Sequence, residues 1–431
     1  MSRALNSKYT KTFFNTIMLY LLAIAKILFP LVTLPYLTRV LSLEAYGAVS
    51  YVKSIVAYAQ TAIDFGFILS SVRDIVNANR EKELTARVVG NTIVAKLMLA
   101  VAAFVAILIL AFVVPTLRDY KVLLLLSFIT PLLSCFLLDF FFRGVERMHI
   151  VSVIYVSMKA ISTVLTVILI KGDEHLLLIP VFDAISSLVA ISITWCIYKR
   201  TGFGVKFDGI KGAIRKIRES FFFFANSAAS NVFGALTTAI IGICITDLRE
   251  VAYWSVSIQL VGAIQLMYAP LSQGVYPHMI KSKDLSLIRK ILYVFVPLVC
   301  LGSIIAAFIS PTLLSIVGGE DYRDASTVFR CLLPVLIISF PVAILGWPTL
   351  GAIGKTKQIN IATLSGALAQ LASLAALYIF NSFTIVNVAI MRNLSELVMF
   401  GVLLAFTMKY RKMFSLKVSG EAVLDESEKS S

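Results

Sequence analysis

Four lysines lie deep inside apolar segments of this chain: Lys26, Lys53, Lys96 and Lys159. A charge inside a membrane is costly, so such a residue usually faces a partner, a water-filled cavity or a substrate path. In the same half of the chain only Asp64 and Asp183 are acidic residues at comparable depth. The excess of positive charge predicts a site for an anion. Lysine suits phosphate because its ammonium is a compact point charge.

The polar residues of these segments follow helical spacing. In residues 45–71 and 150–170, successive members of each polar set lie three or four positions apart, which places each set on one helix face. The first set is Tyr46, Ser50, Lys53, Ala57, Gln60 and Asp64, and the second is Ser152, Tyr155, Lys159, Ser162 and Thr166. We therefore expect a substrate path lined by Lys26, Lys53, Lys159, Lys96, Gln60, Asn15 and Tyr155.

Some of these charges have a second interpretation. Asp64 and Asp183 could form structural ion pairs with the lysines, or couple transport to protons or sodium ions. Arg392 and Glu396 are one helical turn apart and could neutralise each other. The side chain of Lys96 lies nearer one end of its segment and could extend to the membrane interface.

Prolines and neutral polar residues complete the pattern. Pro30 and Pro35 each remove a backbone donor close to Lys26, so we expect a kink there that serves as a hinge. Further candidate kinks lie at Pro270, Pro277, Pro341 and Pro348. In the second half, neutral side chains could bind sugar hydroxyls or hold helices together: Asn226, Ser230, Asn231, Thr237, Gln259, Gln265 and Gln273.

The elements that carry these residues are membrane spans. Apolar residues make up 59% of the 431 residues and charged residues only 15%. Many apolar runs approach the ~20 residues that cross a bilayer as a helix. We predict an all-α polytopic membrane protein with twelve transmembrane helices, near residues 13–38, 45–71, 88–114, 119–142, 150–170, 176–198, 220–245, 251–277, 291–309, 328–350, 358–380 and 384–408.

Charge between the spans sets the orientation. With both termini cytoplasmic, the inward segments carry 26 lysines and arginines and the outward segments carry seven. The positive-inside rule therefore favours this topology and explains most of the net charge of +15. We predict an N-terminal six-helix lobe over 1–198, a C-terminal lobe over 220–408 and a cytoplasmic tail over 409–431. Between the lobes, 199–219 is predicted to be a basic amphipathic cytoplasmic linker.

Several function classes are disfavoured. The chain has no nucleotide-binding loop, no nucleophile elbow and no large acidic outward loop, so we expect neither an enzyme nor a cofactor or metal site. Nucleic acid is not an expected partner. A drug exporter, a membrane-embedded polysaccharide polymerase and a membrane scaffold are the remaining alternatives, and a cationic path argues against cationic drugs.

Four stretches resemble one family: "PYLTRVLSLEAYGAVSY" at 35–51, "DFGFILSSVRDIV" at 64–76, "LDFFFRGVERM" at 138–148 and "GAIGKTKQ" at 351–358. In this order they are similar to the Wzx-type O-antigen and polysaccharide-unit flippases of the multidrug/oligosaccharidyl-lipid/polysaccharide exporter superfamily. The resemblance implies two six-helix lobes that form a V-shaped central cavity. In related lipid-intermediate flippases, cations on helices 1 and 2 face that cavity, and Lys26 and Lys53 occupy matching places.

The resemblance also implies a function. Members carry undecaprenyl-diphosphate-linked oligosaccharides from the inner to the outer leaflet of the bacterial cytoplasmic membrane by alternating access. Their product is O-antigen, capsule or wall polymer. The implied partners are that lipid-linked oligosaccharide, membrane lipids, a polysaccharide polymerase and a chain-length regulator.

Overall fold

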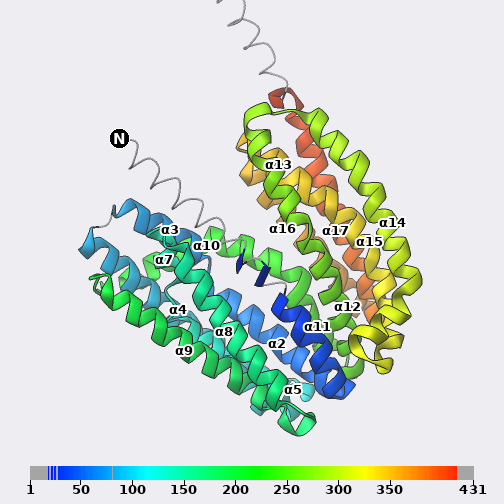
Figure 1. Cartoon of the computed structure of the whole chain (residues 1–431), viewed down its shortest axis with the longest axis horizontal. Coiled ribbons are helices and arrows are strands. Elements are labelled where there is room, and N and C mark those ends of the chain that lie inside the picture. The colour runs from blue at the N-terminus through cyan, green and yellow to red at the C-terminus, as the bar shows by residue number, and fades with distance from the viewer. Residues whose placement is uncertain (1–17, 19–20, 23, 26–27, 80, 415–431) are drawn as a thin grey trace, which may run out of the picture. The chain divides into compact units, whose positions relative to one another are not determined.

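The computed structural model describes residues 18, 21–22, 24–25, 28–79 and 81–414. Every regular element among them is helical (Figure 1). Eleven helices in this part of the chain are long and apolar enough to cross a membrane. The shorter apolar helix Leu28–Val40 covers the longest continuously described part of the first predicted span. The sequence therefore predicted the helical membrane architecture correctly, and the structure describes eleven of the twelve spans at full length.

The helices match the other predicted spans in order. Their bounds are α2 Leu43–Asp64, α3 Phe67–Asn77, α4 Lys82–Val113, α5 Pro115–Asp119, α6 Lys121–Ser134, α7 Asp139–Gly144, α8 Met148–Leu169, α9 Leu178–Arg200, α10 Ile210–Asn231, α11 Thr237–Cys244, α12 Leu248–Leu266, α13 Tyr268–Ser282, α14 Leu285–Gly318, α15 Ser326–Ile344, α16 Thr356–Ile379 and α17 Ile385–Lys409. π-helical turns join α10 to α11 (η2, Val232–Leu236) and extend α15 (η4, Leu345–Leu350).

The chain divides into two compact units, Met1–Ala252 and Tyr253–Ser431, and α12 runs across the division. In the first unit, α9 packs on α6 and α8, while α10 packs on α2, α3 and α4. Its main core gathers aromatic rings from α7, α9 and the segment after α9, with the Phe141 ring edge-on to Tyr198 at 4.8 Å and to Phe203 at 5.5 Å. This core fixes the ends of the helices that carry Lys159 and Asp183.

In the second unit α15 is the central helix. It packs on α14 and α17, and its π-helical extension η4 packs on α13, α16 and α17. The core around it includes Tyr268, which lies edge-on to Phe340 at 5.2 Å and donates its hydroxyl to the carbonyl of Leu336. In contrast, few residues in the apolar part of α14 are buried.

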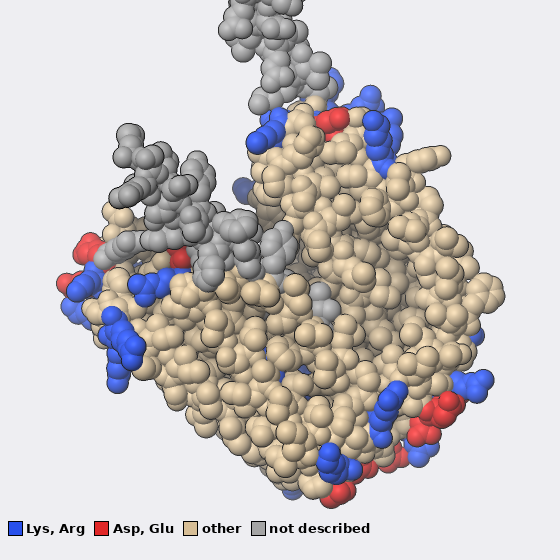
Figure 2. Space-filling view, viewed as in Figure 1, with Lys and Arg blue, Asp and Glu red and all other residues tan. Residues whose placement is uncertain are grey.

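Charged side chains gather toward the helix ends in each unit, and the apolar middles carry few on the face shown (Figure 2). Large exposed hydrophobic side chains cover those middles, among them Val101, Ile109, Tyr293 and Phe308. In water such a surface would be unfavourable, whereas lipid tails solvate it at no cost. The distribution is that of a multi-pass membrane protein.

Three predicted spans are interrupted or distorted in the structure. The predicted helix 45–71 is two helices, because Phe65 and Gly66 both have positive φ between α2 and α3. The predicted kinks in the spans with Pro270 and Pro348 coincide with the α12–α13 break at Met267 and with η4. By contrast, the helix from Leu28 to Val40 continues through Pro30 and Pro35, so their role as a hinge stays a prediction.

Candidate functional site

The first group of interest centres on Lys53, halfway along α2. Ser42 caps this helix by accepting a hydrogen bond from the Ala45 backbone at 3.2 Å. The side chains on either side, Val52 and Ser54, are buried, whereas Lys53 is exposed. Lys53 is therefore accessible to solvent-sized molecules, unlike its two neighbours on α2.

Lys159 on α8 and Asp183 on α9 lie within electrostatic range of Lys53. Both are partly buried. Ser162 donates its hydroxyl to one carboxylate oxygen of Asp183 at 2.6 Å, which orients that carboxylate. Neither lysine ammonium has a hydrogen-bond partner among the residues that the structure describes. The structure thus brings two predicted lysines together with a single acid, and we call Lys53, Lys159 and Asp183 the lysine cluster.

Lys96 belongs to a different group. Only 5% of this residue is exposed, and its ammonium lies 2.8 Å from a carboxylate oxygen of Asp64. Gln60 donates to the other carboxylate oxygen at 2.8 Å and to the Ser134 hydroxyl at 2.8 Å. Asp64 therefore neutralises Lys96, and three spans meet at this carboxylate. Lys96 does not reach out to the interface.

The end of α2 positions Asp64. Immediately after it, Phe65 stacks on Phe224 of α10 with ring centroids 4.2 Å apart and planes 7° from parallel. A Cβ on Gly66 would lie 2.5 Å from the Cβ of Phe223, so only glycine allows α10 to approach this closely. The Lys96–Asp64 pair is consequently tied to the position of α10.

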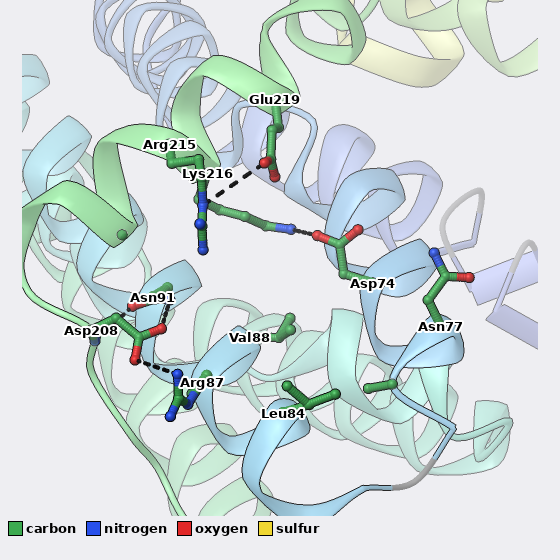
Figure 3. Close-up of a pocket in the computed structure, with 12 residues that line it drawn as sticks. Asp74, Asn77, Leu84, Arg87, Val88, Asn91, Asp208, Arg215, Lys216 and Glu219 are labelled. Atoms are coloured by element: carbon green, nitrogen blue, oxygen red, sulfur yellow. Dashed lines mark hydrogen bonds and ion pairs between the residues drawn. The ribbon is translucent and has the colours of Figure 1, made fainter.

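A polar pocket of about 370 Å³ lies between α3, α4 and the start of α10 (Figure 3). Lys216, which is 5% exposed, reaches across it to Asp74. Asn91 donates to the carboxylate of Asp208 at 2.9 Å and accepts from its backbone N–H at 3.1 Å, while Arg87 pairs with the same carboxylate at 3.6 Å. Opposite charges balance around the pocket, so it serves to hold α10 against α3 and α4.

The sequence did not reveal this pocket, because its partners lie far apart in the chain. Residues 210–219 form the first turns of the long helix α10. Their buried face is Gly212, Ala213, Lys216 and Ser220, while Ile210 and Ile214 are exposed. Whether residues 199–219 link two lobes at the membrane surface stays a prediction.

Arg392 and Glu396 form a buried pair in the second unit, one turn apart on α17, with 2.6 Å between charged atoms. Beside them, Ser395 donates to Gln370 of α16 at 2.7 Å, and Asn393 donates to the Cys331 carbonyl of α15 at 2.7 Å. These bonds join three helices, and a structural role accounts for them.

The remaining predicted site residues are placed as follows. Tyr155 lies one turn before Lys159 on α8 and is partly buried. Asn15 and Lys26 lie outside the described residues. Among described residues of the first predicted span, Met18 accepts a hydrogen bond from the Ser152 hydroxyl at 2.8 Å, and Tyr36 donates to the Ile170 carbonyl at 2.6 Å.

Comparison with known proteins gives the family. A family model described as "Polysaccharide biosynthesis protein" matches residues 13–283. A "Putative O-antigen transporter" of Shigella dysenteriae is 25% identical over 366 residues, which covers 83% of this chain and 90% of the relative. A protein of the same description from Escherichia coli (strain K12) is 21% identical and covers 74% of this chain and 79% of the relative.

Solved structures give the fold. The lipid II flippase MurJ in its inward closed conformation superposes with a TM-score of 0.69 at 14% identity, covering 92% of this chain and 87% of that one. An inward-facing multidrug resistance transporter of the MATE family gives 0.67 at 14% identity, covering 90% and 95%. These structures belong to transporters and not to enzymes. The chain belongs to the polysaccharide biosynthesis protein family, and it has the fold of these MATE and MurJ structures.

Proposed function

We propose that this protein is a flippase that moves undecaprenyl-diphosphate-linked oligosaccharide repeat units from the inner to the outer leaflet of the bacterial cytoplasmic membrane. The units then serve the synthesis of a surface polysaccharide. The family and the two O-antigen transporter relatives support the substrate class. The observation that carries the proposal is the lysine cluster, which holds two ammonium groups and one carboxylate within the membrane-spanning helices.

The cluster has the chemistry that a diphosphate needs. An anion that leaves water must find replacement donors, because an uncompensated charge in a medium of low dielectric constant is very unfavourable. Lys53 and Lys159 have donors to offer, whereas Lys96 already donates to Asp64. Lys53 and Lys159 therefore bind the diphosphate in this proposal, and Lys96 supports the end of α2.

The sequence pattern puts Lys26 in the first predicted span, at a position that lies outside the described residues. We propose that Lys26 contributes a third ammonium group to the same diphosphate site.

The membrane potential supplies a driving force in this proposal. Moving one charge through 100 mV is worth about 2.3 kcal/mol, so a diphosphate of charge about −2 gains roughly 4–5 kcal/mol when it moves outward. The empty cationic site is drawn back inward by the same field. In this proposal both termini are cytoplasmic, and alternating access exposes the site to each leaflet in turn.

A multidrug-type exporter is the second candidate, since MATE transporters share the fold. Fold alone does not select between them. The lysine cluster does, because a net positive site repels the cationic drugs that such an exporter would carry. A drug-resistance assay in cells that express the protein checks this alternative.

Leaflet exchange in proteoliposomes tests the proposal. Native protein exchanges a labelled undecaprenyl-diphosphate oligosaccharide, and Lys53→Gln together with Lys159→Gln slows exchange about tenfold or more, because a hydrogen bond to a charged group is worth about 1.5–3 kcal/mol. Lys121→Gln, which removes one lysine charge at the exposed start of α6, leaves the rate unchanged. Equal rates in all three proteins refute the role of the cluster. Absence of exchange by native protein refutes the flippase.

A further inference from the structure

Trp347 is an exposed ring in a turn that is otherwise buried. Of residues 344–350, all are buried except Trp347, which is 55% exposed. The other two tryptophans differ: Trp254 is completely buried, and Trp195 is partly buried and donates its indole N–H to the Phe136 carbonyl at 3.1 Å. Packing in the core does not explain a large aromatic side chain at this position, because the ring is exposed.

The backbone of η4 is built to turn this ring outward. Pro348 has no N–H with which to bond the carbonyl of Ile344, and the Thr349 hydroxyl donates to that carbonyl instead at 2.8 Å. Gly346 adopts a ψ of −108°, outside the helical range. Such π-helical turns occur frequently at functional sites.

A second aromatic ring lies beside the first. A Cβ on Gly351 would be 3.0 Å from Cε3 of Trp347 and 3.6 Å from Cε2 of Tyr276. Both rings therefore lie next to Gly351 and close to each other. Tyr276 lies on α13, three residues after Gln273, and neighbours at this spacing share one side of a helix. Gln273 is exposed. The surface therefore combines two rings with an amide that can both donate and accept hydrogen bonds.

The surroundings of Trp347 differ from the apolar exterior of its unit. Exposed apolar side chains follow one another along α14, where Tyr293 is 82% and Phe308 is 81% exposed, and along α16 and α17. Trp347 is instead the one exposed residue of its turn, and its neighbours on α13 are a partly buried tyrosine and an exposed glutamine. Rings next to an amide fit a ligand that has both an apolar face and hydroxyl groups.

We propose that Trp347 and Tyr276 form a platform on which a sugar ring of the transported oligosaccharide stacks, with Gln273 binding its hydroxyl groups. This inference rests on the proposed function. The C–H face of a pyranose is apolar and packs on an aromatic face, while its rim needs donors and acceptors. The platform thus recognises the sugar, whereas the lysine cluster recognises the diphosphate that all such carriers share.

The test compares two labelled substrates in proteoliposomes, undecaprenyl-diphosphate oligosaccharide and undecaprenyl diphosphate without sugar. Trp347→Leu lowers exchange of the first about fivefold to tenfold, the scale of a lost aromatic stacking contact, and leaves exchange of the second unchanged. Trp347→Phe keeps most of the activity because it keeps a ring. Tyr293→Leu removes an exposed ring from α14 and is the matched control, with no effect on either substrate. An equal loss with both substrates overturns the platform.

Tryptophan emission provides a readout that does not depend on transport. The part of the emission that Trp347→Phe removes belongs to Trp347. Adding the free oligosaccharide to native protein changes the Trp347 emission and reduces its quenching by iodide. Quenching of this part by brominated phospholipid, with no protection by the oligosaccharide, shows a lipid-facing ring and overturns the proposal. If native protein exchanges neither substrate, the flippase function fails, and the emission result still decides whether the platform binds sugar.

Discussion

Gly66→Ala should destabilise the first unit more than its size suggests. Gly66 has φ +72° and ψ 11°, and an added Cβ would lie 2.5 Å from Cβ and 2.8 Å from the carbonyl carbon of Phe223. A left-handed conformation costs an L-residue about 1–2 kcal/mol. Forcing a methyl group into a packed contact adds about 1–3 kcal/mol. The lower entropy of the unfolded alanine chain returns about 0.4–1 kcal/mol, so we expect a net loss of about 2–4 kcal/mol.

The free energy of unfolding in mixed detergent micelles measures this loss. Gly354→Ala is the control, because Gly354 has nearly the same backbone, φ +75° and ψ 14°, with no atom within 4 Å of an added Cβ. It should lose only about 1 kcal/mol, the cost of the left-handed backbone. The difference between the two variants isolates the contact with α10. Equal losses would show that α10 does not press on the α2–α3 break and would refute the reasoning.

Three further variants test charged groups. Asp74→Asn leaves Lys216 buried without its counter-ion and should lower the free energy of unfolding by about 3 kcal/mol. The double variant Asp74→Leu/Lys216→Met should regain most of this loss, because it removes both charges. If Asp74→Asn alone causes no loss, the buried pair is contradicted. Glu396→Gln should cost a similar amount by stranding Arg392, and circular dichroism during detergent unfolding would reveal it. Asp284 caps α14, and hydrogen bonds from the hydroxyl and backbone N–H of Ser286 hold the pKa of its carboxyl below the ordinary value. Its stabilisation is therefore complete well above pH 4 and is lost as the pH falls through the lowered pKa of the folded state. Asp284→Ala should cost about 1 kcal/mol at pH 7, and this cost should shrink as the pH falls below about 4.

The sequence predicted the spans well because membrane helices are specified locally. Each needs about 20 apolar residues in a row, and such runs can be recognised without knowing what they contact. The predicted spans at 150–170 and 384–408 agree with α8 and α17 within two residues at each end. Proline also acts locally, and Pro348 correctly indicated the distortion of η4.

The interruption at Phe65 and Gly66 depends on distant residues and was not predicted. A single glycine inside an apolar run is common in membrane helices, so the pattern favoured one helix over 45–71. What requires the break is the close approach of Phe223 and Phe224, more than 150 residues further along the chain. The pair of Lys216 with Asp74 was missed for the same reason, since the two residues are 142 positions apart.

The distribution of the lysines shows what spacing can and cannot predict. Helical spacing placed Lys53 and Lys159 on polar faces, and Lys96 was expected either on the substrate path or extended to the membrane interface. Only the fold shows that Asp64 on α2 pairs with Lys96 on α4, whereas Asp183 lies within electrostatic range of Lys53. In the proposed function, the carboxylate of Asp183 limits the affinity of the lysine cluster for a diphosphate, so that the anion can be bound and then released. Asp183→Asn is therefore expected to increase binding of undecaprenyl diphosphate while slowing its exchange.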